Sequence, residues 1–227
     1  MNRYIYKLKS KIKNTFIRQQ NSSSIHSYWQ NPPIDSTGRT SNRPERYADE
    51  NLLPRSKFIF DVCKNLISDN DHIIELGCGI GRNLNYFQSK GYKNLYGIEI
   101  NVNAVSKMNI IYPNLKDTVK NIIAGKIEEN IQKFPKDFFH LVFTMATLQH
   151  IHKDYEKYVF NEISRICGLY LVIVEDELTV SDRHFLRNYR KVFIKLGFNQ
   201  IDVIEGVKII NANLPVGYIC RIFKKGE

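Results

Sequence analysis

The sequence predicts an α/β fold, in which a doubly wound and mostly parallel sheet of seven strands ends in an antiparallel hairpin. From residue 72 onward, short apolar runs alternate with segments of helical periodicity, a pattern typical of strands joined by crossover helices. The last two apolar runs are joined by residues 211–215, Asn-Ala-Asn-Leu-Pro, which predict a turn. Because no helix-length periodic segment separates these two runs, we expect them to pair antiparallel.

The pattern of each segment gives the expected element boundaries. Strands are expected at 72–76, 94–100, 119–124, 139–145, 168–175, 200–206 and 216–224. Helices are expected at 52–67, 82–90, 101–111, 127–133, 153–166 and 182–196. Residues 21–46 are rich in Ser, Asn, Pro, Gly and Thr, which predicts a loop. We therefore expect an N-terminal extension over 1–49 and a single domain over 50–227.

Length and composition suit one packed domain with an extension. The chain has 227 residues, of which 43% are hydrophobic, and no apolar run approaches the ~20 residues of a membrane span. The N-terminus lacks the continuous apolar core of a secretory signal, so a cytoplasmic location is expected. The 4 cysteines are widely spaced without a C-x-x-C pair, so neither a disulfide nor a metal site is predicted.

The positive charge is concentrated at the N-terminus. The net charge is +10, but residues 1–20 carry six basic side chains and no acid, which leaves +4 for the rest. Apolar residues from Tyr4 to Phe16 recur between these basic residues at helical spacing, which predicts a basic amphipathic helix. This helix could dock on the domain as a lid, mediate dimer contact, lie on an anionic membrane surface, or bind nucleic-acid phosphates. The oligomeric state stays open.

The central motif is a glycine-rich turn between the first strand and the helix that follows it. Residues 75–83 read Glu-Leu-Gly-Cys-Gly-Ile-Gly-Arg-Asn, with three glycines at alternate positions. Glycine allows backbone conformations that other residues avoid and lets a ligand approach the main chain. The helix that follows directs free N–H groups toward the turn. Glu99, near the end of the next strand, can accept hydrogen bonds from two ribose hydroxyls.

This combination resembles the class I S-adenosylmethionine (SAM) methyltransferases. The dinucleotide-binding pattern G-x-G-x-x-G fails, since Arg82 occupies the place of its third glycine. The alternatives are another kind of nucleotide binder and a turn whose glycines serve only packing. The resemblance covers roughly residues 50–225 and extends, more loosely, to stand-alone members associated with surface-polysaccharide genes. It implies a seven-stranded fold that binds SAM.

The resemblance also implies a set of cofactor-binding residues. Glu75 is expected to face the ammonium group of SAM, and Glu99 to bind its ribose. Lys126 stands where the family commonly has an acid that reads adenine, so Glu128 or the backbone near Ile127 is expected to take that role. The remaining candidates are Gly77, Cys78, Gly79 and Gly81 in the turn, Arg82 and Asn83 after it, Ile100 and Met145 at strand ends, and Arg43 and Arg55 for the cofactor carboxylate. Asn83 could equally cap its helix.

The segment after the fourth strand supplies the catalytic candidate. Residues 146–152 resemble the family's Leu-x-His-Ile segment beside the transferred methyl group, which makes His150 the candidate general base. The alternative is that His150 hydrogen-bonds within its loop and orients its neighbours. The candidates for contact with the substrate are His152, Glu175, Arg187 and Tyr189, and the alternative for the last two is an ordinary helix surface.

The predicted activity is methyl transfer from SAM to an oxygen or nitrogen of a small-molecule or sugar acceptor. Alignment of the reactants is expected to provide most of the rate enhancement, with His150 assisting deprotonation. One alternative is an RNA or protein methyltransferase that holds a polyanion through the basic tail. The chain lacks the Asn/Asp-Pro-Pro-aromatic segment of enzymes that methylate amino groups of nucleic bases. Another alternative is a non-catalytic SAM-fold protein that binds a partner.

Overall fold

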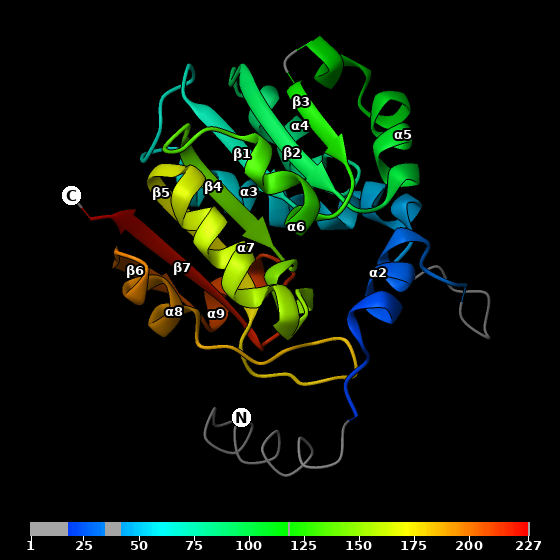
Figure 1. The fold of residues 1–227 in the computed structure, drawn as a ribbon. Helices are drawn as coiled ribbons and strands as arrows, with labels where there is room; N and C mark the ends of the chain where they lie inside the picture. The colour runs from blue at the N-terminus through cyan, green and yellow to red at the C-terminus, as the bar shows by residue number, and fades with distance from the viewer. Residues whose placement is uncertain (1–17, 35–41, 118, 227) are drawn as a thin grey trace.

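A seven-stranded sheet forms the centre of the molecule (Figure 1). The computed structural model describes residues 18–34, 42–117 and 119–226, so the helix predicted for 1–20 lies almost wholly outside them. The strand order is β3-β2-β1-β4-β5-β7-β6. The first five strands in this order pair in parallel, and β7 pairs antiparallel with both β5 and β6. The predicted fold class, including the antiparallel C-terminal pair, is confirmed.

The observed boundaries lie close to the predicted ones. The strands are β1 His72–Leu76, β2 Asn94–Glu99, β3 Val119–Ala124, β4 Phe139–Met145, β5 Cys167–Asp176, β6 Phe198–Ile204 and β7 Tyr218–Lys225. The α-helices are α2 Ser22–Gln30, α3 Leu53–Cys63, α4 Arg82–Gln88, α5 Val102–Ile111, α6 Ile127–Asn130, α7 Lys153–Ile166, α8 Tyr189–Lys195 and α9 Val207–Asn211. The 3₁₀ helices are η1 Pro44–Ala48, η2 Glu50–Leu52, η3 Pro113–Asp117, η4 Ile131–Lys133 and η5 Leu148–His150.

Two hydrophobic layers cover the two faces of the sheet. Successive strand residues point to opposite faces, so Ile73 packs in one layer and Ile74 in the other. The first layer joins the sheet to α3, α4, α5 and α9, and the second joins it to α6, α7 and α8. Both faces are therefore buried, as the continuous apolar runs of the central strands require.

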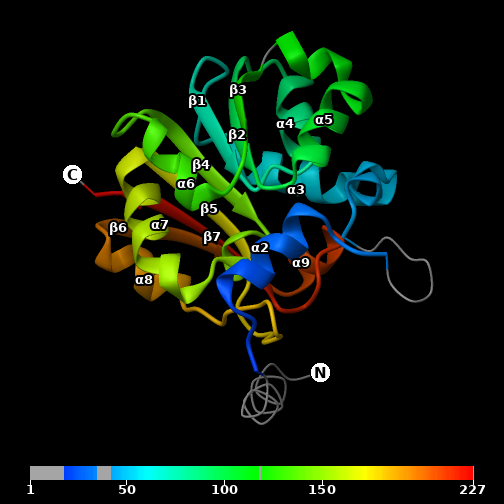
Figure 2. The same cartoon turned by 45° about the vertical axis from the view of Figure 1, so that its right-hand side comes forward.

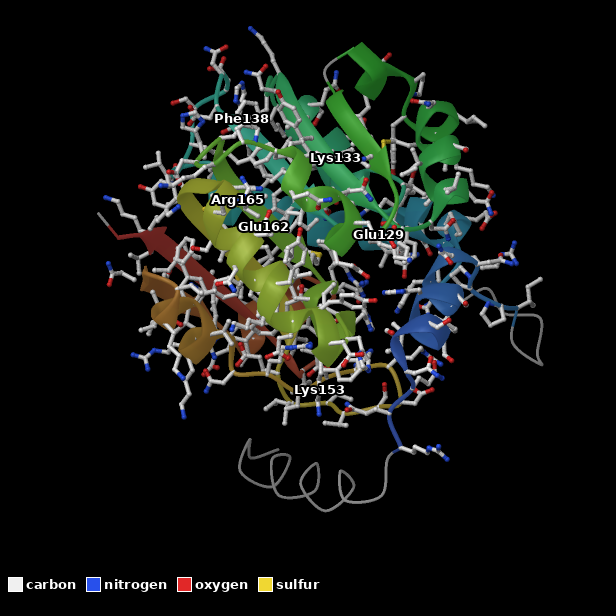
Figure 3. All side chains as sticks on the ribbon, viewed as in Figure 1. Glu129, Lys133, Phe138, Lys153, Glu162 and Arg165 are labelled. Atoms are coloured by element: carbon white, nitrogen blue, oxygen red, sulfur yellow. The ribbon has the colours of Figure 1, made fainter. Side chains whose placement is uncertain are left out.

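Side-chain contacts attach α7 to the end of the sheet opposite the glycine turn. Arg165 donates to the carbonyl oxygen of Phe134 (2.9 Å) and pairs with Glu162 on its own helix (2.7 Å; Figure 3). At the other end of α7, the Nδ1 atom of His152 accepts from the backbone N–H of Asp154 (3.2 Å) and caps the helix. The helix thus has fixed ends, and its first turn lies beside the segment that follows β4.

One expected loop contains a helix. Residues 22–30 form α2, although the composition of 21–46 predicted a loop. The side-chain oxygen of Asn21 accepts from the backbone N–H of Ser24 (2.8 Å), which caps the helix, and Ile25 is buried against the domain. The local signal was the Asn-Ser-Ser-Ser start, and tertiary packing of Ile25 adds to it.

The helix predicted for 182–196 begins later than expected. Only Tyr189–Lys195 is helical, and Asn188 caps it by accepting from the backbone N–H of Lys191 (2.9 Å). Before Asn188, the local backbone bond from His184 to Ser181 closes a turn, and the next residue bonds to a distant segment. The N–H of Phe185 donates to the carbonyl oxygen of Gln149 (2.8 Å), which prevents a helical turn there. Within the part of the chain that the structure describes, no helix is long and apolar enough to cross a membrane.

Candidate active site

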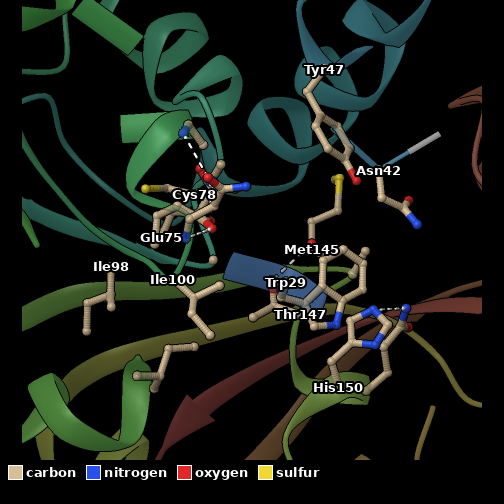
Figure 4. A pocket seen from close by; sticks show the side chains of 18 of the residues that line it. Trp29, Asn42, Tyr47, Glu75, Cys78, Ile98, Ile100, Met145, Thr147 and His150 are labelled. Carbon is tan, nitrogen blue, oxygen red and sulfur yellow. Dashed lines mark hydrogen bonds between the residues drawn. The ribbon is translucent and has the colours of Figure 1, made fainter. Parts of the chain in front are cut away.

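A cavity of about 470 Å³ lies beyond the carboxyl ends of β1, β2 and β4 (Figure 4). This is where the strand order reverses between β1 and β4, the usual ligand position in open α/β sheets. The helix α2 crosses this edge of the sheet (Figure 2). Side chains of α2 and of η1 line the cavity together with the strand ends. The N-terminal segment therefore forms one wall of the site.

The glycine turn forms the floor of the cavity. Gly77, Gly79 and Gly81 all have positive φ angles, of 76°, 56° and 77°. A Cβ atom on Gly77 would lie 2.2 Å from the side-chain oxygen of Thr147, so only glycine fits between these two segments. The backbone N–H of Gly77 donates to the carbonyl oxygen of Ile98 (2.8 Å), which fixes the turn against β2.

Glu99 joins the turn to the end of β2. Its Oε2 accepts from the backbone N–H of Gly79 and its Oε1 from that of Asn101, both at 2.8 Å. Burial raises the pKa of Glu99, and the hydrogen bonds from Asn101 and Gly79 oppose that effect. Each carboxylate oxygen keeps acceptor capacity for a further donor, as two neighbouring hydroxyls would supply.

Two buried atoms of opposite charge have no partner next to this turn. Glu75 is 2% exposed, and its Oε1 accepts from Asn83 (2.7 Å), while its Oε2 has no hydrogen bond. Arg82 donates through Nε to Ser56 (2.9 Å), while its Nη1 has no acceptor. Burial raises the pKa of Glu75 to about 8; the Asn83 hydrogen bond and the charge of Arg82 oppose this effect, and the charge of Glu99 adds to it. An unpartnered carboxylate oxygen beside an unpartnered guanidinium N–H suits the ammonium and carboxylate of an amino acid.

The segment after β4 is held by a buried acid. Glu175 accepts from the hydroxyl of Thr144 (2.8 Å) and from the backbone N–H groups of Thr147, Leu148 and Gln149 (3.0, 3.0 and 3.2 Å). Ala146 has a φ of 59°, a conformation that residues other than glycine seldom adopt. The chain thus turns sharply at Ala146, and Glu175 fixes the turn that follows.

His150 lies at the far end of the cavity from the glycine turn. Its Nδ1 is 2.9 Å from the carbonyl oxygen of Arg183, which assigns the ring proton to Nδ1 because a carbonyl only accepts. Its Nε2 is 3.3 Å from the side-chain nitrogen of Gln149. Burial lowers the pKa of His150 to about 3, and His184, 4.6 Å away between ring centroids, adds to this effect. His150 is therefore a neutral ring at physiological pH.

Aromatic residues of α2 cover this end of the cavity. The ring centroids of Trp29 and His150 are 4.4 Å apart, and the guanidinium of Arg183 lies 3.9 Å from the ring centroid of Tyr28. His26 pairs with Glu128 at 2.7 Å. These contacts attach α2 to both the Glu128 side and the His150 side of the cavity, so α2 spans it.

The cavity brings together most of the residues that the sequence indicated. Those lining it are Glu75, Gly77, Cys78, Gly79, Arg82, Asn83, Glu99, Ile100, Ile127, Glu128, Met145, Arg55, His150 and His152. Glu128, expected to read adenine, is already paired with His26. Sequence reasoning singled out neither Gln149 nor Tyr218, which also line the cavity; the side-chain nitrogen of Gln149 lies 3.2 Å from the hydroxyl of Tyr218. Gln149 stands next to His150 in sequence, whereas nothing in the sequence marks Tyr218.

Five predicted residues lie outside the cavity lining. Gly81 serves the turn itself, and Arg43 lies 4.0 Å from Glu45 on the extension. The three others, expected to contact substrate, have structural partners. Glu175 holds the segment after β4, and Arg187 donates to the carbonyl oxygens of Leu148 (2.9 Å) and Ile151. Tyr189 is fully buried in the second hydrophobic layer. In the structure the first two support the segment that carries His150, and Tyr189 supports the core; their contact with a substrate stays a prediction.

Comparisons with known proteins agree with the fold and the motif. Residues 74–168 match the sequence model of a family described as a methyltransferase domain. No protein with a curated description matches the chain significantly.

Solved structures of SAM-dependent methyltransferases share the fold. One from Archaeoglobus fulgidus has a TM-score of 0.60 at 14% identity, over 80% of this chain and 97% of that one. The 1,6-didemethyltoxoflavin-N1-methyltransferase of Burkholderia thailandensis, solved with 1,6-didemethyltoxoflavin and S-adenosylhomocysteine, has a TM-score of 0.61 at 14% identity, over 90% and 87%. A TehB-like enzyme from Corynebacterium glutamicum gives 0.59 at 16% identity, over 80% and 97%.

The unpartnered atoms of the cavity fit the cofactor of this family. SAM carries an ammonium and a carboxylate, which match the free Oε2 of Glu75 and the free Nη1 of Arg82. Its ribose hydroxyls match the remaining acceptor capacity of Glu99. Residues 74–168 thus form a methyltransferase domain by their match to the family model, and the glycine turn, the sheet order and this fit agree with the fold of class I S-adenosylmethionine-dependent methyltransferases.

Proposed function

We propose that the enzyme methylates an oxygen or nitrogen of a small-molecule acceptor that binds between the glycine turn and the segment carrying His150. The observation that carries this proposal is that one cavity, beside α2, is lined by Glu75, Glu99 and His150, with Glu75 and His150 at different ends of it. Its volume of about 470 Å³ lies within the range of roughly 300–1,000 Å³ that is usual for small-molecule sites. A covered cavity of this size suits a small acceptor better than a folded macromolecule.

Each cofactor-binding residue has a defined part in this proposal. Bound SAM supplies a methyl group on a positively charged sulfur, ready for attack by a nucleophile. Glu99 holds the ribose, and Glu75 together with Arg82 holds the amino-acid end, so the reactive carbon is fixed relative to the chain. Ile100 and Ile127 supply apolar surface at the cavity wall beside Glu99 for the base.

In this proposal, alignment of the two reactants provides most of the rate enhancement. Fixing two reactants in an attack geometry can remove about 7–11 kcal/mol of the barrier. A histidine whose pKa is about 3 has little tendency to take a full proton at neutral pH. We therefore assign His150 the role of a neutral hydrogen-bond acceptor. Its Nε2 would leave the side-chain nitrogen of Gln149 and accept from the hydroxyl or amine of the substrate, which orients that group.

A labelling experiment tests the proposed function. The protein is incubated with methyl-labelled SAM and with three fractions of a cell extract: molecules below 1 kDa, RNA, and proteins. Label is expected in the low-mass fraction. Label in RNA or protein would favour the alternative that uses the basic residues 1–20, most of which lie outside the described residues. Absence of label from all three fractions, with SAM bound, would favour a non-catalytic binding protein.

Binding of S-adenosylhomocysteine, the demethylated product, is expected to strengthen with rising pH up to about 8. The pKa of Glu75 is raised to about 8, so below that pH the carboxyl must release a proton before it can pair with the ligand ammonium. Affinity should change by about tenfold per pH unit between pH 6 and 8. In the unliganded protein the sign is opposite: stability falls as pH rises from the ordinary pKa of 4.5 through 8, since ionising buried Glu75 is unfavourable. Calorimetry at pH 6, 7 and 8 measures the affinity.

The controls for this pH effect isolate the amino-acid end of the ligand. Methylthioadenosine has no ammonium group, so its affinity should stay constant over the same range. Glu75→Gln should bind S-adenosylhomocysteine weakly and without this pH dependence. A pH-dependent affinity that persists in Glu75→Gln would contradict the assignment of Glu75.

His150→Ala is expected to lower kcat by about tenfold, the effect of one lost orienting hydrogen bond. SAM affinity should change less, because His150 lies at the end of the cavity away from Glu75 and Cys78. Turnover of the labelled low-mass fraction and calorimetric binding of S-adenosylhomocysteine give the two values. A loss of 10²–10⁴-fold, together with a wild-type pH profile that titrates near 6.5, would instead indicate that His150 acts as a general base.

A further inference from the structure

We infer that the methyl acceptor carries a carboxylate or phosphate group and that Arg46 and Arg55 bind this group. The inference rests on the proposed function and specifies the chemical class of its substrate. Arg46 belongs to η1 and Arg55 to the first turns of α3, and both line the cavity.

Neither arginine is neutralised by the part of the chain that the structure describes. Arg55 donates through Nε to the carbonyl oxygen of Asn213 (2.9 Å), and its two terminal nitrogens have no acceptor among the described residues. The Arg46 side chain makes no hydrogen bond, and neither residue forms an ion pair among residues 18–34, 42–117 and 119–226. Burial lowers the pKa of Arg55, and the nearby charge of Arg46 adds to the lowering. Two guanidinium groups therefore face the cavity without a counter-charge.

The carboxylates that line the cavity are committed elsewhere. Glu99 bonds backbone N–H groups, Glu128 pairs with His26, and Glu75 accepts from Asn83 with one free oxygen toward Arg82. SAM brings one carboxylate, and the free Nη1 of Arg82 lies in the same charge cluster as Glu75. This pairing uses the cofactor carboxylate and leaves the charges of Arg46 and Arg55 for the other ligand of the cavity.

Three further groups that line the cavity can donate hydrogen bonds to an anion. The hydroxyls of Tyr47 and Tyr218 lie near enough to influence the pKa of Arg55, and both residues line the cavity. Trp29, whose ring is tilted against that of His150, has a buried Nε1–H without an acceptor among the described residues. An indole N–H can only donate, and a guanidinium fork matches the paired oxygens of a carboxylate or phosphate. An acceptor with acidic oxygens satisfies all of these groups.

The first step of the test assigns the cofactor carboxylate. Full-length wild type, Arg55→Gln and Arg46→Gln are titrated with S-adenosylhomocysteine and with methylthioadenosine, which lacks the carboxylate. Both variants should bind both ligands as the wild type does. If Arg55→Gln weakens S-adenosylhomocysteine tenfold but not methylthioadenosine, Arg55 holds the cofactor and the inference is overturned. A wild type that binds neither ligand would instead reject the proposed function.

The second step tests the anion site in the protein saturated with S-adenosylhomocysteine. Inorganic phosphate, acetate and neutral acetamide are titrated by calorimetry or by the shift of the unfolding midpoint. Phosphate or acetate should bind and acetamide should not, and the tighter of the two anions indicates the source of the charge. Arg46→Gln and Arg55→Gln should each weaken the anion by about tenfold or more, since each removes a charged hydrogen-bond donor.

A matched control makes the second step decisive. Arg190→Gln removes the same charge from an exposed position on α8, outside the cavity, and should leave anion binding unchanged. The inference is overturned if neither anion binds the loaded wild type, or if Arg190→Gln weakens binding as much as the cavity variants do. A double Arg46→Lys/Arg55→Lys variant should retain part of the affinity, because lysine keeps the charge and loses the fork geometry.

Discussion

Replacing Glu99 with alanine is expected to weaken SAM binding by about 100-fold or more. Without the carboxylate, the complex would lose two charge-assisted hydrogen bonds to the ribose, each contributing about 1.5–3 kcal/mol. A loss of about 1.4 kcal/mol corresponds to a tenfold lower affinity. The same substitution frees the backbone N–H groups of Gly79 and Asn101, which now bond to Glu99, so the turn also becomes less ordered. Calorimetric titration with S-adenosylhomocysteine measures the loss.

A second ligand separates the ribose role of Glu99 from the role of Glu75. Methylthioadenosine retains the ribose and lacks the amino-acid group, so Glu99→Ala should weaken both ligands alike, whereas Glu75→Gln should weaken only S-adenosylhomocysteine. Thermal unfolding without ligand checks that the variant is folded. Unchanged binding of both ligands by folded Glu99→Ala would remove the ribose assignment.

Replacing Glu175 with alanine is expected to lower the free energy of unfolding by about 2–4 kcal/mol. The backbone N–H groups of Thr147, Leu148 and Gln149 would lose their acceptor, and each buried donor left unpaired costs about 1–3 kcal/mol. Part of this loss is offset because burial raises the pKa of Glu175 to about 7, so its ionised form is already unfavourable. Urea denaturation at pH 7.5 measures the change.

The control for Glu175 is an exposed acid on α6. Glu129 is 58% exposed in its side chain and pairs with Lys126, so Glu129→Ala should change stability by less than about 1 kcal/mol. If Glu175→Ala were equally mild while abolishing acceptor binding, Glu175 would contact the substrate, as its position at a strand end first suggested. The measured stability thus separates a structural role from a binding role.

The fold was predictable because its signals are local and repeated. Each central strand is a continuous apolar run, as a sheet covered on both faces requires. Each crossover helix has apolar residues that recur at helical spacing. The prediction was wrong where long-range contacts override local preference. Residues 22–30 are polar yet helical because Ile25 is buried, and residues near Phe185 are extended because their backbone bonds to Gln149.

The cofactor half of the site was readable from the sequence, since the glycine turn and Glu99 stand at fixed distances along one strand–turn–helix–strand unit. The proposed acceptor half was only partly readable: the sequence indicated His150, and indicated Arg55 for the cofactor carboxylate. It did not place Trp29, Arg46 or Tyr218 beside them, because these residues come from the N-terminal region and the last strand.

The sequence alone therefore determined the sheet, the glycine turn and the position of Glu99 at the end of β2, which depend on spacing within short segments. Only the tertiary structure decided that α2 covers the cavity, and that Glu175 and Arg187 hydrogen-bond to the backbone of the segment that carries His150. The physical reason is that burial and hydrogen-bond partners of a polar side chain depend on segments far away in the sequence. The spacing of residues along the chain does not indicate which distant segments will pack against a given side chain.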